Sequence, residues 1–334
     1  MLSRRRFVSI AASAAALPMF SPQAVAAMPA PVVWRGVAMG AMASMTLVHP
    51  DRGAAKRLIE RCLAEISRLE AIFSLYRPDS ALVRLNADGV LDHPPLELVE
   101  VLSFAAALAR HSDGAFDATV QPLFELYARH FADARADPGG PPPARLAEAL
   151  QLVDHRNVDI ASDRIALRRA GMKLTLNGIA QGYVTDRVAA LLRAEGLENM
   201  LLDLGELRGS GRHPQGRPWR AAIADPSDPR ETLLTVDFQD QPRGLPALAT
   251  SGGYGLHFDA DRRHHHLFDP ATGHSANHHA AVSVAAPNAL VADGLSTALA
   301  AVPPARCGAI LHAYAPAHAY LVGNDGRIAR LGAL

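Results

Sequence analysis

The sequence is poor in cysteine and in net charge, and each shortage argues against a class of protein. Only Cys62 and Cys307 occur among 334 residues, and neither has a CxxC partner, which argues against a cysteine metal or redox site. Cys62 falls on the apolar face of a predicted helix, which favours a buried thiol over a disulfide. The 33 basic and 33 acidic residues balance. This balance gives no electrostatic footprint for nucleic acid or an anionic membrane surface.

Long apolar runs are also missing beyond the N-terminus. A bilayer span takes roughly 20 apolar residues, and no later segment is long and apolar enough to form one. Residues 1–27 have the features of a twin-arginine signal peptide: Arg4-Arg5-Arg6, an apolar stretch to about Phe20, and the small residues Ala24-Val25-Ala26 for cleavage. A frayed basic start or a short uncleaved anchor are the alternatives. We expect export to the periplasm by the twin-arginine route. The chain without this leader has a net charge near −3.

Residues 28–334 are predicted to form one α+β unit with antiparallel-rich sheets and segregated helices. Hydrophobic residues at helical spacing predict helices over 52–75 and 95–111, and further helices are expected near 178–194, 289–302 and 305–314. Short strands are expected at 45–49, 200–204, 282–286 and 319–322, and within 156–176 and 218–286. No GxGxxG follows an early strand, so a dinucleotide-binding Rossmann fold is not indicated. The long run of short strands favours antiparallel pairing.

Residues 131–146 are rich in proline and glycine and predict a surface loop. A boundary between two subdomains could fall here. A loop within one domain explains the composition equally well.

Asp293 and Thr297 are four residues apart in a predicted helix and therefore share a face. A carboxylate and a hydroxyl are hard oxygen donors that suit Mg²⁺, which commonly shares further oxygens with a phosphate-bearing substrate. The alternative is structural: an acid near a helix start and a threonine bonded back to a carbonyl.

Two glycine-containing turns could approach a phosphate. Thr175 to Tyr183 leads from a strand into a helix through Gly178, where helix N–H groups would face an anion. Residues 249–255 place glycines and hydroxyls after an apolar strand. An ordinary strand-to-helix turn and an ordinary hairpin explain the two segments as well.

Seven histidines gather within 23 residues, and three interpretations stay open: a Zn²⁺ or Cu²⁺ site, one general base in a polar loop, or a solvated histidine-rich loop. They are His257, His264, His265, His266, His274, His278 and His279. A further stretch, Gly114 to Leu123, places Asp117 among small and aromatic residues. It could hold a ligand ring, or Asp117 could cap the preceding helix.

Taken in order, these segments resemble the ApbE-like family of FAD:protein FMN transferases over residues 39–322. The markers are Met39-Gly40, Ala71 to Ser80, Gly114 to Leu123, Asn177 to Tyr183, Leu202 to Glu206, Ala249 to Gly253, His266 to Gly273 and Ala292 to Ala298. Each marker is weak alone, and eight in the right order are specific. The Leu176 to Gly182 variant, together with the arginine leader, is most similar to the NosX-like branch, which accompanies nitrous-oxide reduction.

The resemblance implies a single catalytic unit with FAD in a cleft and one bound Mg²⁺. It implies that Asp293, Thr297 and the backbone carbonyl of Gly178 hold the metal, and that His266 deprotonates the acceptor hydroxyl. Contacts to FAD are implied for Met39, Tyr76, Ala115, Phe116, Asp117, Thr175, Gln181 and Phe268.

Four positions depart from the commoner family pattern. Ala41 stands where threonine often follows Met-Gly, Thr175 where aspartate is frequent, and Gln181 where lysine or glutamate is usual. Ser296 replaces a frequent acid beside the metal helix. The lost charges at Thr175 and Gln181 put the strength of nucleotide binding in question, and Ser296 does the same for metal affinity.

The expected activity is Mg²⁺-dependent transfer of FMN from FAD to a threonine or serine hydroxyl of an acceptor protein, with release of AMP. The acceptor expected for an exported enzyme is a protein such as a membrane-bound electron-transfer protein with an exported domain. Alternatives are an FAD pyrophosphatase with water as acceptor, a flavin-binding protein without catalysis, and a periplasmic metal-binding protein that uses the histidine cluster.

Overall fold

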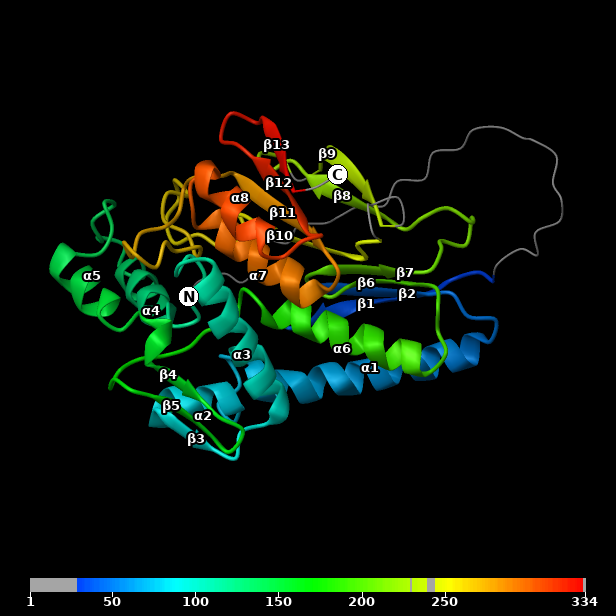
Figure 1. Ribbon diagram of the computed structural model, residues 1–334, viewed down its shortest axis with the longest axis horizontal. Helices are drawn as coiled ribbons and strands as arrows, with labels where there is room; N and C mark the ends of the chain where they lie inside the picture. The colour runs from blue at the N-terminus through cyan, green and yellow to red at the C-terminus, as the bar shows by residue number, and fades with distance from the viewer. Residues whose placement is uncertain (1–28, 229, 239–243, 333–334) are drawn as a thin grey trace.

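The computed structural model describes residues 29–228, 230–238 and 244–332 (Figure 1). The helices are α1 (Arg52–Phe73), α2 (Ala81–Asp88), α3 (Leu96–His111), α4 (Gln121–His130), α5 (Pro143–Leu150), α6 (Ala180–Ala194), α7 (Ala289–Ala300) and α8 (Pro304–His312), with a short 3-10 helix at His155–Asn157. The strands are β1 (Val32–Ala38), β2 (Ala41–Leu47), β3 (Val90–Asp92), β4 (Val158–Ile160), β5 (Arg164–Leu167), β6 (Met200–Asp203), β7 (Leu207–Ser210), β8 (Arg220–Ala224), β9 (Thr232–Asp237), β10 (Ala247–Ser251), β11 (Ala281–Ala286), β12 (His318–Val322) and β13 (Ile328–Leu331).

One eight-stranded sheet, in the order β1-β2-β6-β7-β10-β11-β12-β13, forms the centre of the molecule. All of its neighbouring strands pair antiparallel. Smaller sheets consist of β3-β5-β4 and of the β8–β9 hairpin. The α+β class with antiparallel-rich sheets, predicted from the sequence, is confirmed.

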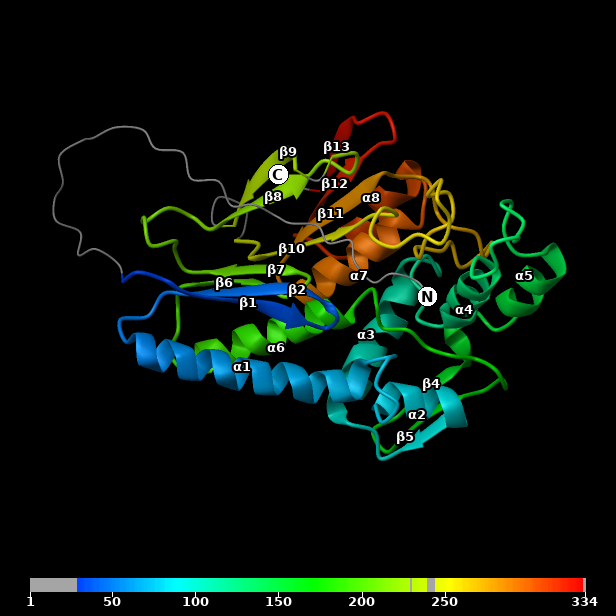
Figure 2. The ribbon, with the colours of Figure 1, turned by 180° about the vertical axis from the view of Figure 1, so that it is seen from behind.

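Helices and the β8–β9 hairpin cover opposite faces of the central sheet, as Figures 1 and 2 show from two sides. α1, α6 and α7 lie on one face and enclose the main core. The hairpin closes the other face over a second core that includes Trp219, Val236 and Phe238. β11 lies between the two cores, with Val284 in one and Ala285 in the other. This explains why all six of its residues are buried and why its sequence, apolar except for Ser283, does not alternate between polar and apolar residues.

The helices predicted from periodicity are confirmed within two residues at each end for α1 and α3. α1 begins at Asp51, whose carboxylate accepts the N–H groups of Gly53 and Ala54. Its inward stripe is Leu58, Cys62, Ile66, Leu69 and Phe73, and Cys62 is a free, fully buried thiol as predicted.

The expectation for residues 131–146 needs a correction at its C-terminal end. Pro143 starts α5, because proline fits the first turn of a helix, where its missing N–H is not needed. The loop connects α4 and α5, which pack together through Leu123, Tyr127, Leu146 and Ala149. The elements with no counterpart in the sequence-based expectation are α2, α4, α5, β1, β3, β7 and β13.

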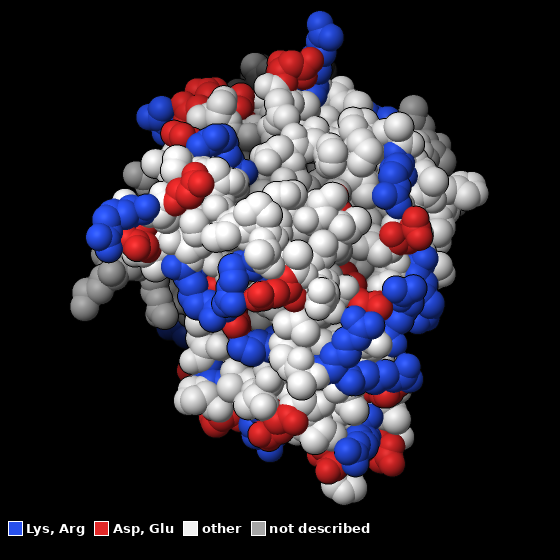
Figure 3. All heavy atoms as spheres, turned by 90° about the vertical axis from the view of Figure 1, so that its left-hand side faces the viewer, with Lys and Arg blue, Asp and Glu red and all other residues white. Residues whose placement is uncertain are grey.

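Charges of both signs are interspersed on the end of the molecule drawn in Figure 3, around an uncharged middle. Within the described ranges, no helix has both the length and the hydrophobicity of a membrane span. The signal peptide predicted for residues 1–27 lies outside the described residues and remains a prediction.

Candidate functional site

The turn that leads into α6 brings the Gly178 backbone against α7. The hydroxyl oxygen of Thr297 lies 3.5 Å from the carbonyl oxygen of Gly178. A Cβ atom at position 178 would lie 2.8 Å from that hydroxyl, closer than real Cβ contacts allow. Glycine is therefore required for this approach.

One turn farther along, α6 and α7 are joined by a second contact. The buried carboxylate of Asp293, 3% exposed, accepts the N–H of Gly182 through Oδ2 at 3.0 Å. A Cβ at Gly182 would lie 2.4 Å from the carbonyl oxygen of Ala289, so a second glycine permits the close packing. The three residues that sequence analysis named as metal ligands, Gly178, Asp293 and Thr297, thus all lie along the contact between α7 and α6 with its preceding turn.

Ser251, at the end of β10, completes this oxygen-rich group. Its hydroxyl lies 3.3 Å from the hydroxyl of Thr297 and 2.7 Å from that of Ser296. Ser296 also donates to the carbonyl of Asp293 within α7. The neutral side chain of Ser296 therefore bonds both to its own helix and to Ser251.

Buried acids surround the Asp293 carboxylate. Burial raises the pKa of Glu206 well above its usual range, and the charges of Asp293 and Asp203 raise it further, against a backbone hydrogen bond from Thr250. Burial also raises the pKa of Asp293; the Gly182 N–H opposes this shift and the charge of Asp186 adds to it. Carboxylates that are costly to ionise together become favourable ligands once a cation is present.

The donor set fits a hard divalent cation. Asp293, Thr297 and the Gly178 carbonyl offer only oxygen atoms, which suits Mg²⁺ and does not suit metals that prefer sulfur or imidazole. Among the described residues, no three His, Cys, Asp or Glu side chains converge as a metal cluster. A cation here would therefore depend on the hydroxyl, the backbone carbonyl and oxygens of a bound substrate.

His266 lies on the loop that follows β10 and Ser251. Its Nδ1 atom is 2.9 Å from the carbonyl oxygen of Leu256. Because a carbonyl can only accept, Nδ1 carries the proton and Nε2 is left as the basic atom. Burial lowers the pKa of His266, partly opposed by the Leu256 carbonyl, so the ring is neutral near pH 7 and able to accept a proton.

Four of the other clustered histidines have structural partners, whereas the buried Nδ1 of His257 has no hydrogen-bond partner among the described residues. His264 Nε2 contacts the Pro138 carbonyl, His265 Nε2 the Asn277 side chain, and His279 Nε2 the Val302 carbonyl. His274 Nδ1 lies 3.3 Å from the Tyr127 hydroxyl. Burial lowers the pKa of His265 to about 4. These contacts favour the interpretation of a single base in a polar loop over that of a histidine metal site.

Three predicted FAD contacts lie beside Thr175. The N–H of Thr175 donates to the carbonyl of Ala118, which places Ala115, Phe116 and Asp117 next to the turn before α6. Ala115 and Phe116 are buried in the main core. The Asp117 carboxylate accepts the N–H and hydroxyl of Thr119 through Oδ1 and the N–H of His155 through Oδ2. It thus orders two turns rather than capping the preceding helix.

The remaining predicted contacts are spread over several elements. Met39 sits in the β1–β2 turn with φ 50°, and its N–H donates to Glu70. Tyr76 is 73% exposed after α1. Phe268 is buried against Tyr127 and Phe258. The Gln181 side chain lies over Gly205, a residue in the turn that follows β6 and precedes Glu206. No FAD-binding role is tested by these placements, and all eight contacts remain predictions.

Sequence reasoning gave no role to Glu206, Ser251 or Asp186, although Glu206 and Ser251 fall inside family markers. Asp186 accepts the N–H groups of Ala289 and Leu290 at the start of α7. Only the contacts between distant segments reveal these roles.

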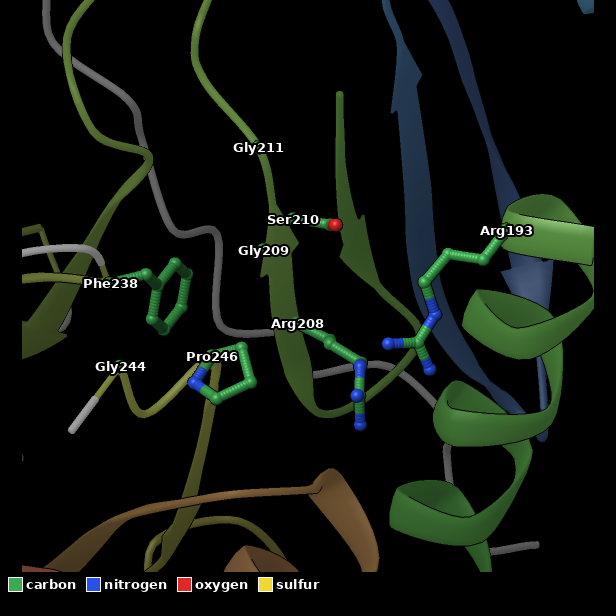
Figure 4. Close-up of a pocket in the computed structure, with 8 residues that line it drawn as sticks. All are labelled: Arg193, Arg208, Gly209, Ser210, Gly211, Phe238, Gly244 and Pro246. Atoms are coloured by element: carbon green, nitrogen blue, oxygen red, sulfur yellow. The ribbon is translucent and has the colours of Figure 1, made fainter. Parts of the chain in front are cut away.

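A cavity of about 270 Å³ beside β7 is separate from the proposed metal site, since none of the predicted metal ligands lines it (Figure 4). Its walls are Arg193, Arg208, Gly209, Ser210, Gly211, Phe238, Gly244 and Pro246.

A family model and several known proteins are similar to this chain over most of its length. The model of the ApbE family matches residues 39–321. The FAD:protein FMN transferase of Salmonella typhimurium is 31% identical over 288 residues, covering 84% of this chain and 81% of that protein. The Haemophilus influenzae protein of the same name is 31% identical over 250 residues, covering 72% and 71%.

Solved structures agree with the sequence relatives. The Pseudomonas stutzeri flavinyl transferase ApbE, in its apo form, superimposes with a TM-score of 0.75 at 27% identity, covering 94% of this chain and 97% of that one. The Vibrio cholerae flavin transferase ApbE gives 0.76 at 26% identity, covering 90% and 97%. The resemblance inferred from the ordered motifs is therefore confirmed, and the chain belongs to the ApbE family.

Proposed function

We propose that this chain is an FAD:protein FMN transferase that uses Mg²⁺ and attaches FMN to a threonine or serine of an acceptor protein. Family membership and the names of its relatives support the transferase activity. The observation that carries the finer proposal is the pair of contacts that hold α7 against α6 and its preceding turn: Thr297 with the Gly178 carbonyl and Asp293 with the Gly182 N–H. It supports a site for a hard cation, because all three candidate donors are oxygen atoms.

The proposed reaction exchanges the phosphoanhydride bond of FAD for a phosphoester bond to the acceptor. The acceptor hydroxyl oxygen attacks the flavin-side phosphorus of FAD, the bond from that phosphorus to the bridging oxygen breaks, and AMP leaves with that oxygen. The hydroxyl proton passes to Nε2 of His266. The Leu256 carbonyl holds the ring proton on Nδ1, and burial lowers the pKa of the ring, so that Nε2 is unprotonated near pH 7. General base catalysis of this kind contributes typically 10²–10⁴-fold.

Residues of this chain orient the reacting groups. The Gly182 N–H fixes one oxygen of Asp293, and the Ser251 hydroxyl lies within hydrogen-bonding reach of Thr297. Asp293, Thr297 and the Gly178 carbonyl would hold the metal. When bound, Mg²⁺ neutralises negative charge on the diphosphate and on the leaving phosphate.

Neutral side chains at Thr175 and Gln181 stand where the family often has charges. The Thr175 hydroxyl accepts the N–H of Asn177 at 3.3 Å, and Gln181 packs over Gly205. We propose that both serve the nucleotide through hydrogen bonds rather than through charge, which keeps FAD as the substrate. The NosX-like assignment remains a prediction.

The leader sequence supports export through the twin-arginine route to the periplasm, where the acceptor would be an exported domain such as that of a membrane-bound electron-transfer protein. Replacing Arg5 and Arg6 with lysine tests this. The wild-type chain should be recovered from the periplasmic fraction and the variant from the cytoplasm. Equal recovery from the periplasm would refute the proposed route.

The activity is tested by incubating the purified chain with FAD, Mg²⁺ and a candidate acceptor domain. Flavin fluorescence that stays on the acceptor in a denaturing gel, with one AMP released per flavin attached, supports the transferase. Free FMN plus AMP would identify a pyrophosphatase. Bound flavin without AMP would identify a binding protein. An acceptor whose target hydroxyl is removed should show no flavin fluorescence on the denaturing gel.

A further inference from the structure

Three contacts, each about one helical turn from the next, connect α6 and its preceding turn to α7. Gly178 meets Thr297, Gly182 meets Asp293, and Asp186 meets the start of α7 at Ala289. From one contact to the next, the residue number rises by four along α6 and its preceding turn and falls by four along α7, so the two segments run antiparallel. The first two contacts belong to the proposed metal site, and the third lies beyond it.

Asp186 satisfies the first backbone donors of α7. Its two carboxylate oxygens accept the N–H groups of Ala289 and Leu290, each at 2.9 Å. Asn288 accepts the N–H of Val291 at 2.8 Å. The free N–H groups at the start of a helix need such partners, and a negative charge there also interacts favourably with the helix dipole. The cap from α6 therefore connects the position of α7 to that of α6.

Arg208 on β7 holds this carboxylate in place. Its guanidinium forms a close ion pair with Asp186, and both side chains are largely buried. Burial lowers the pKa of Arg208, while the charge of Asp186 opposes this shift. Figure 4 places Arg208 on β7 with its guanidinium turned toward α6, from which Arg193 extends into the same region. The pair thus joins the sheet, α6 and α7.

We propose that Asp186, held by Arg208, is a positioning residue that fixes the register of α7 on α6. It would thereby set the spacing of Asp293 and Thr297 from the Gly178 carbonyl. A helix advances about 1.5 Å per residue. A shift of α7 along α6 by a single residue would therefore move the oxygen atoms of Asp293 and Thr297 away from the Gly178 carbonyl. Mg²⁺ tolerates little departure from octahedral geometry, which makes the site sensitive to such a slip. This inference rests on the proposed function for its metal, while the contacts that carry it do not involve any ligand.

The test compares Asp186→Asn with Asp51→Asn. Asp51 caps α1 through the N–H groups of Gly53 and Ala54, at the end of α1 that lies away from α7 in Figures 1 and 2. Each variant removes the charge of a carboxylate that accepts two N–H groups at the start of a helix. Mn²⁺ serves as the probe, titrated by calorimetry into protein with FAD present, and amide hydrogen exchange is followed at Ala289, Leu290 and Gly182.

Asp186→Asn should weaken Mn²⁺ binding by about 10–100-fold, as changes behind a metal ligand commonly do. It should also speed exchange at the three amides. Asp51→Asn should leave both unchanged, since asparagine caps a helix about as well as aspartate. Asp186→Glu, which keeps the carboxylate, should recover part of the affinity. Arg208→Gln, the second variant if Asp186→Asn does not fold, should reproduce its effects.

Mn²⁺ affinity within twofold of wild type in Asp186→Asn or Arg208→Gln would overturn the proposal. Equal losses of affinity in Asp186→Asn and Asp51→Asn would also overturn it, because that result means general destabilisation. If the wild-type chain transfers no FMN, the proposed function fails separately. Hydrogen exchange then still decides whether Asp186 fixes α7, and unchanged exchange in the variant refutes it.

Discussion

The hydroxyl of Thr297 and the backbone carbonyl of Gly178 lie 3.5 Å apart, although 119 positions separate the two residues in the sequence. The contact joins the two family segments from which the metal site was inferred. It exists because position 178 has no side chain. The proposed chemistry therefore depends on a backbone atom as much as on the Asp293 carboxylate.

Gly178→Ala should weaken metal use while leaving the fold intact. The added Cβ would lie 2.8 Å from the Thr297 hydroxyl and must displace it or the turn. The Mg²⁺ concentration for half-maximal transfer should rise about tenfold or more. The matched control is Gly308→Ala in α8, where nothing lies within 4 Å of an added Cβ. An unchanged Mg²⁺ requirement in Gly178→Ala would exclude the carbonyl as a ligand.

The stabilisation that Mg²⁺ gives should grow with pH. Since burial raises the pKa of Asp293 above its unfolded value, this group costs the metal-free protein stability as the pH rises through its folded pKa. A bound cation offsets that cost and competes with the proton. Saturating Mg²⁺ should therefore raise the melting temperature more at about pH 8 than at about pH 6. Asp293→Asn should abolish the difference, and its persistence in that variant would assign it to another group.

His266→Gln should lower the rate constant for transfer by about 10²–10⁴-fold with FAD affinity unchanged. The wild-type rate should fall on the acidic side only below the ordinary histidine pKa near 6.5, because burial lowers the pKa of His266. Single-turnover rates against pH measure both effects. His264→Gln, two residues earlier in the same loop, should have a normal rate. A His266→Gln rate near that of wild type would remove His266 from the mechanism.

Acid should destabilise the loop that carries His266 through its neighbour His265. The buried ring has a folded pKa of about 4 against an ordinary value of 6.5. Its contribution to stability is therefore complete above about pH 6.5 and is lost as the pH falls toward the folded value, roughly 3 kcal/mol in all. Urea unfolding at several pH values should show a shallower decline for His265→Gln. An identical decline would mean that other groups account for the acid sensitivity.

Local patterns predicted much of the fold. The apolar stripe of α1 has the spacing of a helix with one buried face, and the short, mainly apolar run of β11 ends before Pro287, so local sequence located both elements. α4 was missed because its sequence begins inside a segment interpreted as a ligand contact, with Pro122 near its start. The pairing order of the central sheet depends on contacts between distant strands, which no local pattern specifies.

The metal group was predicted mainly through the family resemblance, because spacing alone left Asp293 and Thr297 ambiguous. Ser251, Glu206 and Asp186 were not assigned, since each acts across more than 40 positions or through burial. Gln181 looked like a lost charge in the sequence. In the structure its side chain fills the space over Gly205, which gives the neutral residue a packing role.

The most direct test of the account is the amount of flavin covalently attached to an acceptor domain by the wild-type chain and by Asp293→Ala, each with limiting Mg²⁺. We expect the wild type to label the acceptor, EDTA to abolish the labelling, and the variant to label it at least about 100-fold more slowly while melting near the wild-type temperature. Labelling by Asp293→Ala at the wild-type rate would contradict the metal site on which the proposed mechanism rests.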